Sequence, residues 1–281
     1  MRFFTITIFL FVSCYLVAQD QNGQQYALTT STFTFGAGPA QVLDPYISPF
    51  TYSGLQIRAQ GTARKFFTPE NNLLSYTHNA FFDLGTATHP SRNNSMQFFN
   101  VNYMFGVNYH FRPMDKLMVL AGGSWDIDVG GKYLARNVNN PFSLDLFTNL
   151  NATAGVQYLF NLWKQDFRVQ YGAQMPLFGC MFVPMQGITY YELFMLNNLS
   201  TAFHFSSLHN KIGWSHYVNL DIPTKISTFR VSIMHDYLKY SANEMVFRKS
   251  GLTFSVGTVV DLYVFSGKKR EVPANFIRSY E

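Results

Sequence analysis

His89 and Ser91 stand two positions apart with Pro90 between them, and a histidine beside a serine can support nucleophilic chemistry. A serine becomes a nucleophile when a histidine accepts its proton across about 2.6–3.2 Å. The surrounding residues, 86–95, are polar and rich in turn formers, which indicates a loop. Because a proline separates the two residues and no particular asparagine is placed to orient the histidine, we expect a solvated loop rather than a hydrolytic site.

A second candidate is a pair of carboxylates, Asp126 and Asp128, in a segment where apolar and polar residues alternate. Alternation predicts a β-strand, so both carboxylates share one face. Such a pair can act as general acid and base or bind Ca²⁺. The alternative is a packed interior of ion pairs and hydrogen bonds. A near-balance of acids and arginines on the polar strand faces favours this alternative: Arg58, Arg64, Asp83, Asp126, Asp128, Arg168, Arg230, Asp236 and Asp261.

A third candidate lies in residues 179–209, where the alternation breaks. The segment holds aromatic and histidine side chains at Tyr190, Tyr191, Phe194, His204 and His209. The two histidines are five positions apart and no cysteine joins them, so we predict no metal site there. No motif indicates a cofactor. The aromatics could bind a glycan or a partner protein, or fold inward as a plug; we expect the plug, because an aromatic loop in water exposes a large apolar patch.

The element that must position these residues is best seen in residues 99–111, FNVNYMFGVNYHF. Seven apolar residues alternate there with three asparagines, a histidine, a methionine and a glycine. Period two excludes an amphipathic helix, whose period is 3.6. Thirteen residues at ~3.3 Å each make a strand of roughly 40 Å, long enough to cross a bilayer when tilted. The segment therefore predicts a membrane-spanning strand.

The pattern recurs along the chain and predicts a transmembrane antiparallel up-and-down β-barrel of about ten strands, with twelve possible if residues 179–209 hold another hairpin. Charged residues are only 13% and aromatics 17%, yet the mean hydropathy is −0.02. A barrel reconciles these values, because each strand alternates lipid-facing and lumen-facing side chains. Connections near 69, 114, 163 and 223 are expected to be short periplasmic turns, and those near 44, 90, 136, 194 and 245 longer extracellular loops.

The chain ends predict export. Arg2, an apolar run and Ala18 resemble a secretory signal peptide over residues 1–18, followed by the barrel over 19–265 and a polar periplasmic tail over 266–281. The location predicted is the cell outer membrane, with outer-membrane lipid around the barrel. Export disfavours nucleic acid as a partner despite the net charge of +5. An envelope protein or a glycan could meet the extracellular loops, and nothing indicates an oligomeric state.

Four stretches together resemble a family of Bacteroidota outer-membrane proteins catalogued as domain of unknown function 3316. They are LDPYISP at 43–49, YLARNVNNP at 133–141, TYYELF at 189–194 and HFSSLHN at 204–210. The resemblance covers most of the mature chain and implies an outer-membrane barrel. It implies no activity and no site residues. The hypotheses are therefore a small-solute channel or envelope component, an outer-membrane hydrolase or lipid-modifying enzyme with its site at the extracellular rim, and an interaction protein.

Overall fold

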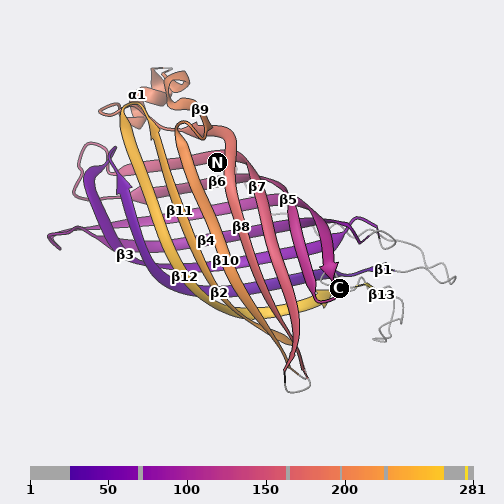
Figure 1. The fold of residues 1–281 in the computed structure, drawn as a ribbon. Helices are drawn as coiled ribbons and strands as arrows, with labels where there is room; N and C mark the ends of the chain where they lie inside the picture. Colours follow the sequence, from indigo (N-terminus) through magenta and orange to yellow (C-terminus); the bar gives the residue numbers. More distant parts are fainter. Residues whose placement is uncertain are drawn as a thin grey trace, which may run out of the picture.

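The computed structural model describes residues 26–68, 72–162, 165–196, 198–224, 227–262 and 276–277. Within these ranges, ten antiparallel strands form a closed ring (Figure 1). Around the ring they are β2 (Thr29–Asp44), β3 (Ser48–Phe66), β4 (Leu74–Thr88), β5 (Ser95–Met114), β6 (Leu117–Tyr133), β7 (Phe142–Leu162), β8 (Gln165–Phe182), β10 (Lys211–Pro223), β11 (Thr228–Ala242) and β12 (Met245–Leu262). The predicted ten-stranded barrel is confirmed.

The ring closes through pairs of strands that are distant in sequence. β12 pairs with β2, where Val256 lies opposite Phe35, and β8 pairs with β10, where Tyr171 lies opposite Val218. Front and back strands cross at a large angle in Figure 1, which is the strong tilt that closing a ring of few strands requires. Closure leaves no long unpaired edge in the described part of the ring.

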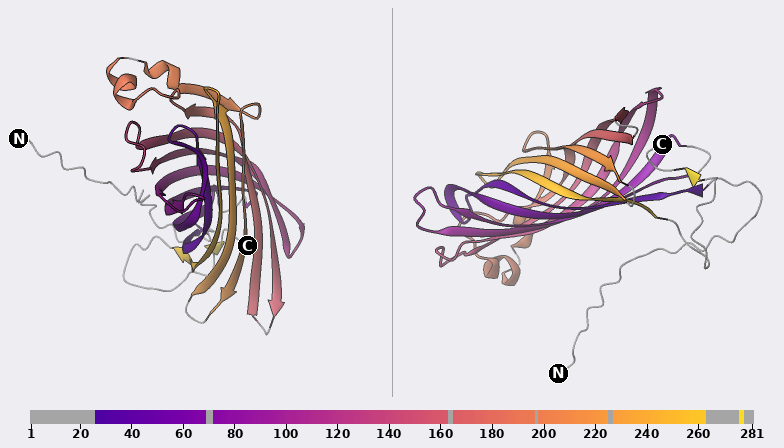
Figure 2. Two further views of the ribbon diagram at one scale, coloured as in Figure 1. Left: turned by 90° about the vertical axis from the view of Figure 1, so that its left-hand side faces the viewer. Right: turned by 90° about the horizontal axis from the view of Figure 1, so that it is seen from below.

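One end of the barrel carries the longest connection, and we call it the α1 end. It holds α1 (Tyr190–Met195), η1 (Leu199–Ala202) and β9 (Phe203–Ser207), and α1 projects from the barrel in Figure 2. β9 pairs with the last residues of β8, from Phe178 to Phe182, while β10 pairs with β8 further down. β9 and β10 therefore lie end to end along one strand, so the segment adds no further hairpin to the ring and the twelve-stranded alternative is wrong.

The alternation of residue types decides which face each side chain takes. Along β5, Val101 and Phe111 are exposed on the outside, whereas Asn102 and His110 are buried inside. The same division holds on neighbouring strands, where Leu55 and Phe82 point outward. The outer surface is therefore an apolar band and the interior is polar over most of its length. No helix within the described ranges is long and apolar enough to cross a membrane.

The predicted contrast between short turns and long loops is only partly right. Residues 134–141 and 183–210 are long connections, but β2 and β3 are joined by residues 45–47 and β11 and β12 by residues 243–244. Asp44 makes the first turn tight, because its side chain accepts from the Tyr46 N–H at 3.1 Å and its carbonyl from the Ile47 N–H at 3.2 Å. Asn243 and Glu244 both have positive φ, the conformation of a two-residue type I′ hairpin. The strands therefore extend further at the α1 end than predicted.

The predicted signal peptide and most of the predicted tail lie outside the described residues. Two residues of the tail are described, because β13 (Phe276–Ile277) pairs in parallel with β1 (Tyr26–Ala27).

Candidate functional site in the barrel lumen

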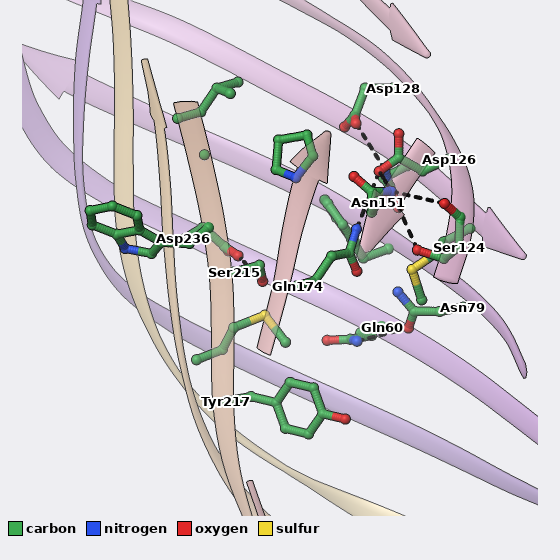
Figure 3. A pocket seen from close by; sticks show the side chains of 18 of the residues that line it. Gln60, Asn79, Ser124, Asp126, Asp128, Asn151, Gln174, Ser215, Tyr217 and Asp236 are labelled. Atoms are coloured by element: carbon green, nitrogen blue, oxygen red, sulfur yellow. Dashed lines mark hydrogen bonds between the residues drawn. The ribbon is translucent and has the colours of Figure 1, made fainter. Parts of the chain in front are cut away.

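The inward side chains enclose a cavity of about 280 Å³ in the middle of the barrel (Figure 3). Its lining is mostly amides, hydroxyls and charged groups, among them Gln60, Asn79, Asn151 and Ser215. At ~30 Å³ per molecule, a polar cavity of this size holds on the order of ten waters. The lumen is therefore a small wet chamber rather than a solid core.

Arg58 is the centre of the largest charge cluster on the cavity wall. Its Nε and Nη2 donate to Oδ1 and Oδ2 of Asp83 on the neighbouring strand, at 2.6 and 2.8 Å. Its Nη1 forms an ion pair with Oδ2 of Asp236, 2.7 Å away on β11. The guanidinium also covers the Phe81 ring, with Cζ 4.2 Å from the ring centre. Arg58 and Asp83 are buried, so the cluster ties β3, β4 and β11 together across the interior.

Asp221 holds a second cluster that the sequence analysis did not include. It lies opposite Arg230 on β11 and opposite Arg168 on β8. Arg230 donates to both carboxylate oxygens, at 2.5 and 2.7 Å, and Arg168 Nε donates to Oδ2 at 2.8 Å. Asp221 lies two positions before the turn expected near 223, so its period-two spacing from Asn219 is the sequence signal for an inward side chain.

Asp126 and Asp128 are held by amides, not by arginines. Asp126 accepts from Asn149 at 2.7 Å and from Asn151 at 2.9 Å. Asp128 accepts from Asn100 at 2.8 Å and Asn102 at 2.9 Å. Neither carboxylate has an ion pair within the described part of the chain, so the expectation that the lumen acids pair with arginines is wrong for these two. Gln174 also donates to Asp126 at 3.3 Å. Amides from β5, β7 and β8 therefore surround the two carboxylates of β6, and we call this arrangement the amide cradle.

Two further predicted lumen residues, Arg64 and Asp261, hydrogen bond to threonine hydroxyls. Arg64 Nε donates to the Thr77 hydroxyl at 3.4 Å. Asp261 accepts from the Thr30 hydroxyl at 2.7 Å. Asp261 is on β12 and Arg64 on β3, each paired with β2.

At the α1 end, Lys132 is buried between two carboxylates. Its Nζ lies 3.0 Å from Asp44 and 2.6 Å from Asp145, and the Tyr240 hydroxyl donates to Asp145 at 3.2 Å. Lys132 lies close to the long connection expected near 136, but β6 extends to Tyr133 and turns the Lys132 side chain inward. This cluster joins β2, β6, β7 and β11.

A cluster of buried apolar side chains lies inside the barrel at the α1 end, and we call it the mouth plug. The residues that build it point inward from the ends of the strands or come from the turns between them. Phe147 packs edge-on against Tyr240, which stacks on Phe247 with ring centres 4.7 Å apart. Its buried members are Ala40, Val42, Tyr46, Ile47, Tyr52, Ala87, Met96, Phe98, Leu134, Phe147, Met181, Val183, Tyr240, Met245 and Phe247.

The opposite end of the lumen also narrows to buried side chains. Phe66, Met118 and Leu120 are at most 5% exposed. His110 is fully buried, 5.1 Å from the Phe66 ring, and hydrogen bonds to the Ser75 hydroxyl at 2.6 Å. Buried side chains therefore gather inside the barrel at this end as well as at the α1 end.

The aromatic loop contributes less to closure than predicted. Tyr190 packs beside the mouth plug and accepts from the Leu144 N–H at 2.6 Å, and Leu193 is fully buried. Tyr191 and Phe194, by contrast, are 70% and 56% exposed. The expectation that this loop forms the plug is therefore wrong. Inward side chains at the ends of the strands already occupy the mouth, so α1 lies on the rim of the barrel and not inside it.

Two hydrogen-bond arrangements fix this rim. Thr189 caps α1, since its hydroxyl accepts from the Glu192 N–H and Glu192 accepts from the Thr189 N–H. The Thr189 hydrogen bonds lower the pKa of Glu192. Burial, with the Asp44 and Glu192 carboxylates, raises the pKa of Tyr46 to about 12. The Tyr46 hydroxyl therefore stays protonated at neutral pH and donates to the Ile188 carbonyl at 2.6 Å.

The histidines of the rim do not meet. His204 lies on β9 opposite Met181, and His209 Nδ1 lies 2.5 Å from the Ser207 hydroxyl in the following turn. No group of three or more His, Cys, Asp or Glu side chains in the described residues is placed to hold a metal ion.

His89 and Ser91 are in contact, contrary to expectation. The Ser91 hydroxyl lies 2.6 Å from His89 Nδ1, and the Ser91 N–H donates to the same nitrogen at 3.1 Å. The His89 ring packs edge-on against Phe50 and Tyr52. The backbone hydrogen bond brings the two residues together despite the proline, so the contact closes a local turn.

Removing the Asp126 carboxylate tests the amide cradle. In Asp126→Ala the amides of Asn149 and Asn151 lose their acceptor in a buried site, which costs on the order of 1–3 kcal/mol. A folded barrel migrates faster on a gel than the same protein after boiling. We expect the temperature at which this faster migration is lost to be lower for Asp126→Ala. Asp115→Ala, in the exposed turn after β5, is the matched control and should leave that temperature unchanged; equal behaviour of the two variants would contradict the cradle.

The architecture is similar to that of solved outer-membrane barrels. These include the outer membrane protease OmpT from Escherichia coli, at 8% identity over 84% of this chain and 97% of that one, with a TM-score of 0.44. The translocator domain of the autotransporter NalP from Neisseria meningitidis matches at 8% identity over 85% and 90%, with a TM-score of 0.40.

Comparison with protein families and with curated proteins adds two findings. A family model described as "Protein of unknown function (DUF3316)" matches residues 3–269. No curated protein matches the chain significantly.

Proposed function

The chain belongs to the DUF3316 family, and we propose that it is an integral outer-membrane β-barrel with a sealed lumen, acting as an envelope component through its outer surfaces rather than as a solute channel. The observation that carries this proposal is the mouth plug. Its buried apolar side chains pack together inside the barrel at the α1 end. An open pore needs a continuous polar path, which such a layer interrupts.

The lumen charges support the same proposal. Arg58, Asp83 and Asp221 are buried. Arg58 donates a short hydrogen bond to Asp83, and Asp221 accepts one from Arg230. Charges that served permeating solutes would face open water instead. An interior just wide enough for side chains to fill is typical of barrels near eight strands.

The outer surface favours a lipid environment. Phe33, Leu55, Phe254 and Val256, on the three adjacent strands β2, β3 and β12, are each more than half exposed. In water such a band would be an aggregation liability, whereas in a bilayer it is the usual lipid-facing belt of an outer-membrane barrel.

Tags in intact cells test location and orientation together. With the long connections outside, epitope tags near Asn139 and Asn198 should bind antibody on intact cells, and a tag near Pro113, at the end of β5, should bind only after permeabilisation. Carbonate extraction is the control for membrane insertion. Release of the protein by carbonate would contradict the membrane proposal, and surface labelling at Pro113 alone would invert the topology.

A further inference from the structure

Three polar side chains meet on the outside of the barrel, on β10, β11 and β12, which lie side by side in Figure 1. His216 lies directly opposite His235, with its Nε2 3.1 Å from His235 Nδ1. The other nitrogen of His235, Nε2, lies 3.5 Å from the Ser250 hydroxyl. They share the face of the exposed residues Trp214, Ile233 and Phe254. Polar groups rarely gather on a surface that is otherwise an apolar band.

We propose that Ser250, His235 and His216 form a catalytic triad on the lipid-facing surface that cleaves a fatty-acyl ester adjacent to a phosphate. The proposal rests on the outer-membrane location proposed above. In a serine triad the base uses one ring nitrogen for the nucleophile and the other for the group that orients it. His235 is divided in this way: Nε2 faces Ser250 and Nδ1 faces His216. Separations near 3.5 Å are common for such pairs before substrate binds.

The depth of the three residues suits an ester bond. Trp214 stacks on Tyr237, with ring centres 4.9 Å apart, and Tyr237 lies opposite Ser250. Tryptophan and tyrosine on the outside of a barrel gather at the level of the lipid headgroups. Ser250 therefore stands at the boundary between headgroups and acyl chains, where the carboxylic esters of lipids lie.

A cation pair next to Ser250 provides a phosphate site. Lys239 lies directly opposite Arg248 on the same outer face, and both are exposed. Like charges placed opposite each other destabilise a strand pair, and an anion between them would relieve the repulsion. Arg248 is two residues from Ser250 toward the α1 end, about 7 Å along the strand. A lipid phosphate bound there would place its neighbouring ester beside the serine.

The reaction balances with water as the co-reactant. The Ser250 Oγ attacks the ester carbonyl carbon while its proton moves to His235 Nε2. The ester C–O bond breaks, and the proton passes from His235 to the oxygen of the leaving lysolipid. Water then attacks the acyl-serine with His235 as base, which releases the fatty acid and restores the Ser250 hydroxyl. His216 is a positioning residue that accepts from the Nδ1–H of His235 as that ring gains its proton.

The experiment uses the full-length folded protein in detergent micelles containing phosphatidylethanolamine or, separately, lipid A. Fatty-acid release is followed by mass spectrometry, and the protein is also treated with a fluorophosphonate that labels activated serines. We expect release from at least one lipid and labelling of Ser250. Ser250→Ala and His235→Ala should each lose both signals, with release falling by about 10³-fold or more. The preferred lipid identifies the source of the phosphate.

Further variants separate the roles. His216→Gln, whose amide oxygen can accept from His235, should retain more activity than His216→Leu at equal gel mobility. Lys239→Met/Arg248→Met should raise KM and leave kcat nearly unchanged. Ser91→Ala, which removes another serine in contact with a histidine, is the control and should retain full activity and Ser250 labelling.

Three outcomes would overturn the proposal. They are a folded, membrane-inserted protein that neither releases fatty acid nor reacts with the probe, a probe adduct at Ser91 instead of Ser250, and unchanged release by Ser250→Ala. Carbonate extraction and the epitope tags report on the location independently, so the failure of the triad would leave the sealed-barrel proposal standing.

Discussion

Arg58→Met is expected to lower the free energy of unfolding by about 3–5 kcal/mol. The substitution removes the positive charge that pairs with two carboxylates. Asp83 is completely buried and accepts two hydrogen bonds from Arg58, and Asp236 forms the third contact of the same guanidinium. Methionine keeps most of the side-chain length, so the effect isolates the charge. Urea unfolding in micelles, followed by gel mobility and tryptophan fluorescence, measures the change.

Two companion variants make the Arg58 result specific. Arg112→Met removes an exposed arginine at the end of β5 and should change stability by less than about 1 kcal/mol. Adding Asp83→Asn and Asp236→Asn to Arg58→Met removes the stranded charges and should recover a large part of the loss. A triple variant less stable than Arg58→Met would show that the acids are not uncompensated in the single variant.

Opening the mouth plug is expected to turn a silent barrel into a conducting one. In Phe147→Ala/Phe247→Ala, two rings that pack on either side of Tyr240 are lost from the closed cross-section. Water and small ions can then enter the polar cavity from the α1 end. We expect brief conductance steps in planar bilayers where the unmodified protein gives none.

The matched control for the plug is an aromatic side chain on the outside of the same barrel. Phe33→Ala shortens an outward residue that is 60% exposed and should remain silent. If the double variant is as silent as this control although it folds, the plug is not the barrier.

The ring and the faces of its strands could be predicted because period two survives along whole strands. Phe99 to Phe111 carries enough alternation to assign each side chain to one face. The ends of the strands were harder, because Tyr52, Phe98 and Phe247 make the inner face apolar where a polar face was expected. Alternation fades there, so period two alone does not place these residues on the inner face, and the aromatic loop was expected to form the plug.

The sequence alone could not predict which side chains meet inside the lumen or on the outer surface of the barrel. Which acid meets which arginine depends on the register of strands far apart in the chain, as for Arg58 and Asp236. The inward side chain of Asp221 was not predicted, because the residue lies next to a turn. The contact of His216 with His235 likewise depends on the pairing of β10 with β11.

Electrical recording of the unmodified protein in planar bilayers tests the sealed lumen most directly. Insertion is verified by protease protection of the reconstituted vesicles, so that silence reflects a closed barrel and not a missing one. The mouth plug, together with the ion pairs that the lumen charges form, predicts no steady conductance steps at moderate voltage and salt. Large, stable steps from the verified, unmodified protein would contradict the sealed lumen and favour a solute channel.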